Sequence, residues 1–140
     1  MTYMTKKQLL EHLKNNVYCR PMPSSIHGIG IFAIREIPKG VNPFIGCYDG
    51  IDYKFSEKDL SGIHPAVRKL VEDYCVKQNG YIYINASGMY RYDIGYFLNH
   101  SDNPNITTYD NSRTFITTRL IKEGEEITSD YGEYDDDAKS

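Results

Sequence analysis

The densest run of hydrogen-bonding side chains lies in residues 99–105, with the sequence NHSDNPN. Five of these seven residues carry an amide, imidazole or hydroxyl group: Asn99, His100, Ser101, Asn103 and Asn105. Asn, Asp, Ser and Pro are also ordinary residues of turns, so this run alone would indicate a surface loop. Its density around the rigid Pro104 favours a ligand-binding site instead.

Two further segments carry residues suited to ligand binding. Residues 27–33, HGIGIFA, contain Gly28 and Gly30, and because glycine has no Cβ the main chain there can come close to a ligand. Paired glycines also mark many turns, so this segment is a weak signal by itself. Residues 125–134, EEITSDYGEY, contain Tyr131, and tyrosine combines an apolar ring with a hydroxyl that can act inside a dry site.

These three segments have the order and the approximate spacing of the signature segments of SET-domain lysine methyltransferases. The resemblance covers residues 26–134, and its most specific parts are NHS-x-x-PN and the acidic run that leads to DYG. The chain thus resembles enzymes that transfer a methyl group from S-adenosylmethionine to a lysine of a protein, histones included. No Cys follows Cys75, so a compact form of these enzymes, without a Cys-rich zinc module after the domain, is expected.

Such a transfer is an in-line displacement, so the enzyme must align sulfur, methyl carbon and nitrogen and must receive an uncharged amine. A solvated lysine has a pKa of about 10.4, and neutralising it at pH 7 costs about 4.6 kcal/mol. A dry aromatic channel beside a sulfonium lowers that pKa through desolvation and like-charge repulsion. The chain has 13 Tyr and no Trp, so tyrosines are the expected channel walls.

The resemblance implies a role for each matching residue. Tyr131 would be the catalytic tyrosine, while Tyr48 and Ser129 would line the substrate channel. Eight residues would contact the cofactor: His27, Gly28, Ile29, Gly30, Tyr81, Asn99, His100 and Tyr134. A tyrosine in a β-rich protein is more often a packing residue than a catalytic one. His100 could instead be a buried histidine with satisfied hydrogen bonds, and Asn99 could be a helix or turn cap.

Two positions depart from the family pattern. Tyr96 stands three residues before Asn99, where the family often has Arg, so a cofactor contact is lost or replaced. Ser129 stands two residues before Tyr131, where Phe or Tyr is common. Because Ser leaves more room around the amine, we expect methylation beyond the monomethyl state, unless a tyrosine such as Tyr109 fills the space from the side.

The hydrophobic patterns predict a mostly β, β-rich α+β domain with an N-terminal helix and one or two further helices. Residues 1–22 would form an amphipathic helix, capped by Thr5, and a short strand over residues 17–20 that Pro21 and Pro23 end. Residues 23–134 would form the SET domain, and residues 135–140 an acidic tail. The resemblance implies several small sheets and a C-terminal pseudoknot that brings the NHS and DYG segments together.

Within residues 23–134, alternation and β-branching predict strands over residues 31–34, 41–48, 81–85, 113–118 and 127–129. Ser56 and Pro65 are suitable helix starts, and residues 78–80 would close the second of these helices. EIPKG at 36–40 and IKEG at 121–124 have similar turn chemistry.

Composition sets the outer limits. A chain of 140 residues, 40% hydrophobic and 25% charged, suits one soluble domain. No run approaches the roughly 18 apolar residues of a membrane span, and the N-terminus lacks the apolar centre of a signal peptide, so an intracellular protein is expected. The three cysteines, Cys19, Cys47 and Cys75, are too far apart for a metal-binding pair, and no metal is expected.

Charge is distributed unevenly. Residues 123–140 contain one Lys and eight acidic residues, a net charge of −7, whereas the rest of the chain is net positive. Such a segment is either a solvated tail or a surface that attracts a basic protein or peptide. It would repel nucleic acid, which is therefore not an expected partner.

Two functions of other classes remain open at this point. The domain could bind the cofactor or a basic peptide without turnover, or it could serve in assembly, with the leucines of the N-terminal helix pairing two copies into a homodimer. The presence of Asn99, His100 and Tyr131 together favours an enzyme.

Overall fold

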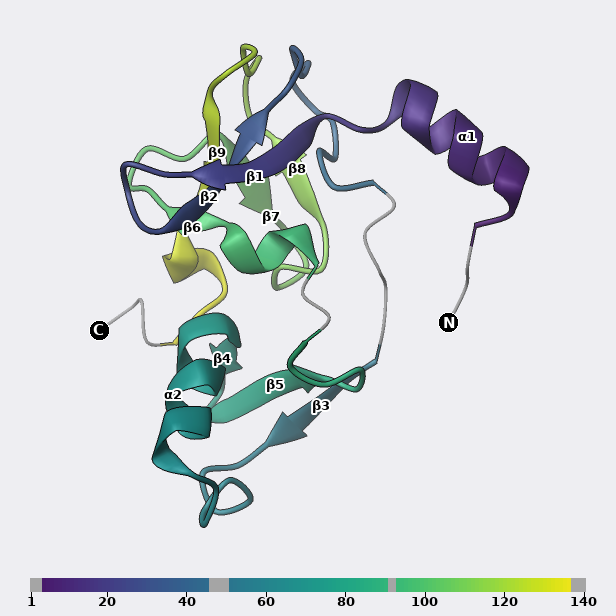
Figure 1. Ribbon diagram of the computed structural model, residues 1–140. Coiled ribbons are helices and arrows are strands. Elements are labelled where there is room, and N and C mark those ends of the chain that lie inside the picture. The colour runs from purple at the N-terminus through teal and green to yellow at the C-terminus, as the bar shows by residue number, and fades with distance from the viewer. Residues whose placement is uncertain (1–3, 46–50, 91–92, 137–140) are drawn as a thin grey trace.

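The computed structural model describes residues 4–45, 51–90 and 93–136 (Figure 1). Strands predominate in this part of the chain and are short, and they form three small sheets with two α-helices and two 3-10 helices. The mostly β class and the several small sheets agree with the prediction. No helix among the described residues has the length and apolar character needed to cross a bilayer.

The first helix, α1 (Lys6–Asn15), lies apart from the sheets (Figure 1). Thr5 caps it as predicted, because the Thr5 hydroxyl accepts the Gln8 amide while the Gln8 side chain accepts the Thr5 amide. The leucines of its apolar face are 46–59% exposed, and none of its residues is buried. The apolar face of the helix is therefore not covered by the rest of the described chain.

The main sheet has the order β1-β2-β9-β6, with β1 (Cys19–Pro23), β2 (Ile29–Ala33), β9 (Glu126–Ser129) and β6 (Asn99–His100). The first strand was expected to end before Pro21, but β1 includes both prolines and ends at Pro23. β1 is an edge strand. The amide of Ser24 donates to the Gly28 carbonyl, and residues along a strand alternate in direction, so the nitrogens of Pro21 and Pro23 point away from β2 and no hydrogen bond to β2 is lost.

Strands β6 and β9 are parallel, with Asn99 opposite Thr128 and His100 opposite Ser129. Their connection contains the hairpin of β7 (Ile106–Thr108) and β8 (Phe115–Thr117). Parallel neighbours need such a long connection. This pairing brings the NHS and DYG segments together, as the resemblance implied.

A second sheet, β3-β5-β4, lies with α2 in the lower part of the molecule (Figure 1). It consists of β3 (Asp52–Phe55), β5 (Tyr81–Asn85) and β4 (Lys77–Gln78). β5 has the predicted bounds, and α2 (Pro65–Tyr74) starts at the predicted proline.

Two expectations in this sheet are wrong. Ser56 starts only a turn, in which Ser56 and Asp59 bond to each other's amides. α2 ends at Tyr74, and residues 79–80 form the β4–β5 turn, because Asn79 and Gly80 both have positive φ.

The two similar turn segments pair with each other. Ile37 and Ile121 form an isolated antiparallel bridge, and both side chains are fully buried in the main core. Residues 41–45, expected as the start of a strand, form none, although the Val41 main chain bonds to Thr117. The remaining residues of that expected strand, including Tyr48, lie outside the described part of the chain.

Candidate active site

Asn99 joins the three signature segments. Its amide nitrogen donates to the carbonyl oxygens of His27, at 3.1 Å, and Ile29, at 3.4 Å. It also lies 2.9 Å from Oε2 of Glu126. Asn99 is only 6% exposed. Its amide nitrogen is therefore fixed by these three protein acceptors and not by solvent. The amide oxygen forms no hydrogen bond with the described residues, so it can accept one from a ligand.

Glu126 is a site residue that the sequence analysis did not single out. Its other carboxylate oxygen accepts the Ser24 hydroxyl at 2.7 Å, so the side chain bridges two segments 102 positions apart. The only sequence signal was the acidic pair before the DYG segment, and such pairs are common on solvated surfaces.

His100 supports the main chain of Tyr131. The Tyr131 amide donates to Nδ1 of His100 at 3.0 Å, so Nδ1 carries no proton and Nε2 does. Nε2 then donates to Asp102 at 2.9 Å. The two rings also contact each other, with centroids 5.2 Å apart. The role that the structure gives to the His100 side chain is therefore to position Tyr131.

Tyr131 begins the short 3-10 helix η2 (Tyr131–Glu133), which Asp130 caps through the Gly132 amide. Its hydroxyl donates to the main-chain oxygen of Leu98, the residue before Asn99. Burial raises the pKa of the Tyr131 phenol, and the nearby carboxylates of Asp135 and Glu126 raise it further. At neutral pH the group is a protonated hydroxyl with a fixed direction.

Ser129 and Tyr134 form a buried hydroxyl pair, with 2.7 Å between Oγ and the phenol oxygen. Ser129 is fully buried, and the Tyr134 ring packs edge-on against Phe115 and Tyr131. Burial is the main cause of a strongly raised pKa at Tyr134. The tyrosine beside Ser129 is therefore Tyr134 and not Tyr109, which is 85% exposed.

The structure places the other predicted site residues less centrally. Gly28 has φ +44, in the left-handed region that favours glycine, and turns the chain so that the carbonyls beside it face Asn99. Tyr81 is 38% exposed on the second sheet, and its ring contacts the Lys54 ammonium at 4.6 Å from the centroid. The described contacts do not link Tyr81 to Asn99, and its cofactor contact stays a prediction.

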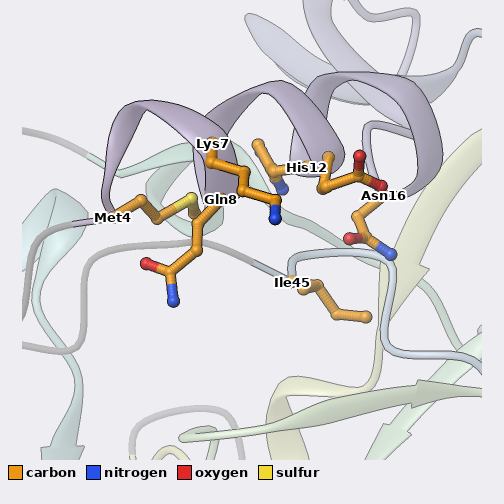
Figure 2. Close-up of a pocket in the computed structure, with 7 residues that line it drawn as sticks. Met4, Lys7, Gln8, His12, Asn16 and Ile45 are labelled. Atoms are coloured by element: carbon orange, nitrogen blue, oxygen red, sulfur yellow. The ribbon is translucent and has the colours of Figure 1, made fainter.

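A separate hollow of about 460 Å³ lies beside α1 (Figure 2). Its lining consists of Met4, Lys7, Gln8, Glu11, His12, Asn16 and Ile45. None of these residues belongs to the expected cofactor or substrate site. Among the described residues no group of His, Cys, Asp and Glu has the arrangement of a metal site.

Comparison with known proteins identifies the family. The SET-domain family model matches residues 28–132, three quarters of the chain. No curated protein sequence matches. Among solved structures, that of a candidate histone methyltransferase of Plasmodium falciparum is similar in fold, with a TM-score of 0.52 and 23% identity. The match covers 83% of this chain and 94% of that one. The chain therefore belongs to the SET-domain family.

Proposed function

We propose that this protein is an S-adenosylmethionine-dependent protein-lysine N-methyltransferase. The observation that carries the proposal is the parallel pairing of β6 with β9, which lets the Tyr131 hydroxyl bond to the carbonyl of Leu98, the residue directly before Asn99. Asn99 faces the glycine segment and Tyr131 faces the buried tyrosine cluster. A site that had lost its activity would have no chemical need for both Asn99 and Tyr131.

The residues around Asn99 fit the amino-acid end of the cofactor. Main-chain oxygens of His27 and Ile29 and the carboxylate of Glu126 converge on one amide nitrogen, which has only two hydrogens for three acceptors. Such an acceptor-rich group suits a primary ammonium. When bound, the cofactor would supply an electrophilic methyl group on a sulfonium, and these residues together with Gly28 would hold and orient it.

Tyr131 would orient the substrate amine. Because its pKa is raised, the phenol is no base at neutral pH, and the lysine must lose its proton to solvent before it is enclosed. The Leu98 carbonyl accepts the hydrogen bond from the Tyr131 O–H group. The lone pairs of the phenol oxygen are then available to accept a hydrogen bond from an N–H of the neutral amine. That contact fixes the direction of the nitrogen lone pair.

We propose that the reaction continues to di- or trimethyllysine. In the resembling enzymes a tyrosine at the position of Ser129 holds a water that crowds the amine. Here Ser129 has no ring, and its hydroxyl ties the Tyr134 phenol to the sheet. A phenol that is held in this way is less able to move toward the amine.

The proposed substrate is a basic protein, with histones as one example, and nucleic acid and membranes are not proposed as partners. Support comes from the acidic side chains that follow β9, which include Asp130, Glu133 and Asp135 close to Tyr131. Their charge would raise the local concentration of a Lys-rich segment. An intracellular location is part of the same proposal.

We also propose a homodimer as the functional form, since the exposed α1 leucines Leu9, Leu10 and Leu13 would be covered by a second α1. Sedimentation of the wild type and of Leu10→Glu/Leu13→Glu tests it. A wild type that is monomeric at all concentrations would remove the dimer and leave the enzymatic proposal unchanged.

The experiment that tests the enzymatic proposal is incubation with methyl-labelled cofactor and a panel of basic proteins, followed by mass mapping of modified lysines. Label on lysine with the wild type and its loss with Tyr131→Phe are expected. Cofactor binding without transfer to any protein of the panel or to a lysine-rich peptide library would favour a binding module instead.

A further inference from the structure

Hydrogen bonds hold Tyr134 from two sides of the molecule. Its phenol oxygen lies 2.7 Å from Oγ of Ser129, at the end of β9 in the main sheet. Its main-chain carbonyl accepts a hydrogen bond from Nε2 of Gln78, at 2.8 Å, and Gln78 belongs to β4 of the second sheet. The buried tyrosine beside Tyr131 is therefore fixed by a residue 56 positions earlier in the chain.

The Gln78 contact is one of three hydrogen bonds that join β4 and its turn to the segment after η2. The other two involve Asp136, whose amide donates to the Lys77 carbonyl at 2.8 Å and whose carboxylate accepts the Gly80 amide at 3.0 Å. These two bonds attach the segment to the second sheet without Gln78. The Gln78 side chain acts one step nearer the site, because its acceptor is the main chain of Tyr134 itself.

The place of the Tyr134 hydroxyl follows from the place of its main chain. A tyrosine side chain has only two rotatable bonds, and this ring packs edge-on against Phe115, at 5.7 Å, and Tyr131, at 6.0 Å between centroids. A shift of the main chain would therefore move the phenol off Ser129. Without that bond, the hydroxyl would turn toward the space beside the Tyr131 hydroxyl, where the amine would lie.

We propose that Gln78 is a positioning residue that determines the degree of methylation. Its amide holds the main chain of Tyr134, so the phenol stays on Ser129 and leaves room for an amine that already carries methyl groups. Gln78 acts through Tyr134 and not through contact with the reacting atoms. This inference rests on the proposed function, because the methylated amine belongs to that function.

Two variants remove the donor of Gln78. Gln78→Glu keeps the shape and replaces the N–H group by a carboxylate oxygen, which repels the Tyr134 carbonyl, and Gln78→Met keeps the length without donor or charge. With a lysine-rich peptide and excess cofactor, the wild type should proceed to di- or trimethyllysine. Both variants should instead accumulate monomethyllysine, with several-fold less of the higher products at long times by mass spectrometry, while the first methyl transfer changes less.

Asn79→Asp is the matched control for Gln78→Glu, because it makes the same amide-to-carboxylate change at the next residue, which is exposed. Asn79 has φ +54, and aspartate tolerates this left-handed conformation. The control should give the product distribution of the wild type. If Gln78→Glu does not fold, Gln78→Met provides both measurements, since it adds no charge beside the acidic segment.

NMR of protein labelled with ¹³C at the tyrosine ζ carbon follows the Tyr134 phenol without any methyl transfer. Tyr134→Phe assigns the signal, and its chemical shift depends on the hydrogen bond of the attached oxygen. Ser129→Ala removes that bond at the ring end and so gives the reference shift for a released phenol. Both Gln78 variants should move the signal toward this reference, whereas Asn79→Asp should leave it at the wild-type position.

A folded Gln78 variant with wild-type products, or with an unmoved Tyr134 signal, would overturn the inference, as would a wild type that stops at monomethyllysine. Equal slowing of every methylation step would also overturn it, because Gln78 would then be only structural. Failure of the proposed function is distinguishable, since a moved signal with no methyl transfer by the wild type would remove the enzyme and keep the hold of Gln78 on Tyr134. Methyl transfer with the same products in all variants would keep the enzyme and remove this inference.

Discussion

At the scale of single residues, the two hydroxyls of the site have different surroundings and different uses. The Tyr131 phenol donates to the main-chain oxygen of Leu98, whereas the Tyr134 phenol is bonded to the buried Ser129 hydroxyl. Burial raises both pKa values, so neither group ionises near neutral pH. The chemistry therefore depends on hydrogen-bond direction and not on a phenolate.

Tyr131→Phe keeps the ring and removes only the hydroxyl. Turnover should fall about 10²-fold or more, in line with the loss of one transition-state contact, while cofactor affinity and unfolding temperature stay near wild type. Single-turnover kinetics with labelled cofactor measures the first, and calorimetry the second. Tyr109→Phe, at an 85% exposed position, is the control. Equal turnover of the two variants would remove the catalytic assignment.

Ser129→Tyr tests the product state. The added ring would displace the Tyr134 hydroxyl from its 2.7 Å contact and crowd the amine, so the variant should stop at monomethyllysine where the wild type proceeds further. Mass spectrometry of the product at long times, with cofactor in excess, gives the comparison. A wild type that itself accumulates only monomethyllysine contradicts the expectation. Ser129→Ala separates size from the hydroxyl tie, because it removes the tie without adding a ring.

The sequence predicts this scale in part. The NHS and DYG motifs single out Asn99, His100 and Tyr131 as candidates, because each of these residues belongs to a short local pattern. Glu126 and Ser24 are not recognisable, since a contact between positions 102 apart has no local pattern. The same holds for the pairing of Ser129 with Tyr134, which depends on how η2 turns the chain back onto β9.

At the scale of elements, Asn105 fastens the connection between β6 and β9. Its amide nitrogen donates to the Glu126 carbonyl at 2.8 Å, and its amide oxygen accepts the Thr128 amide at 2.9 Å. The side chain is 2% exposed and so replaces a strand neighbour along β9. The loop after the NHS motif thereby holds the strand that leads to Tyr131.

Asn105→Ala should lower the free energy of unfolding by about 2 kcal/mol or more, because two buried main-chain groups lose their partner. Chemical denaturation at fixed pH measures this loss. Asn103→Ala, at an exposed position of the same loop, should change stability by less than about 0.5 kcal/mol. Equal stability of the two variants would show that Asn105 does not fasten β9.

Local sequence patterns also decide which helices and strands could be predicted. β5 alternates clearly and α2 begins with Pro65, so both were predictable. The two-residue strands β4 and β6 are too short for any periodicity, and each exists only through its partner. Pro21 and Pro23 suggested an end to β1 because sequence alone does not reveal that β1 is an edge strand.

At the scale of the whole molecule, the C-terminal segment is acidic and also forms structural hydrogen bonds with the second sheet. Asp136 has a structural contact, since its carboxylate accepts the Gly80 amide at 3.0 Å and its own amide donates to Lys77 O. Gln78 likewise donates to the Tyr134 carbonyl at 2.8 Å. The acidic segment after η2 is thus attached to β4 and to the β4–β5 turn, and so connects the main sheet with the second sheet.

Long-range capture of a basic substrate is the prediction that belongs to this scale. Asp135→Asn/Asp137→Asn removes two charges and spares the contact of Asp136, so KM for a lysine-rich peptide should rise several-fold at low salt while kcat changes little. The difference from wild type should vanish as the ionic strength approaches 0.5 M, because screening shortens the reach of the charges to a few ångströms. Glu11→Gln/Glu36→Gln removes the same charge outside residues 123–140 and should leave KM near wild type. If both double variants shift KM equally, only the net charge of the protein matters; if neither does, the segment is a solvated tail with no part in encounter.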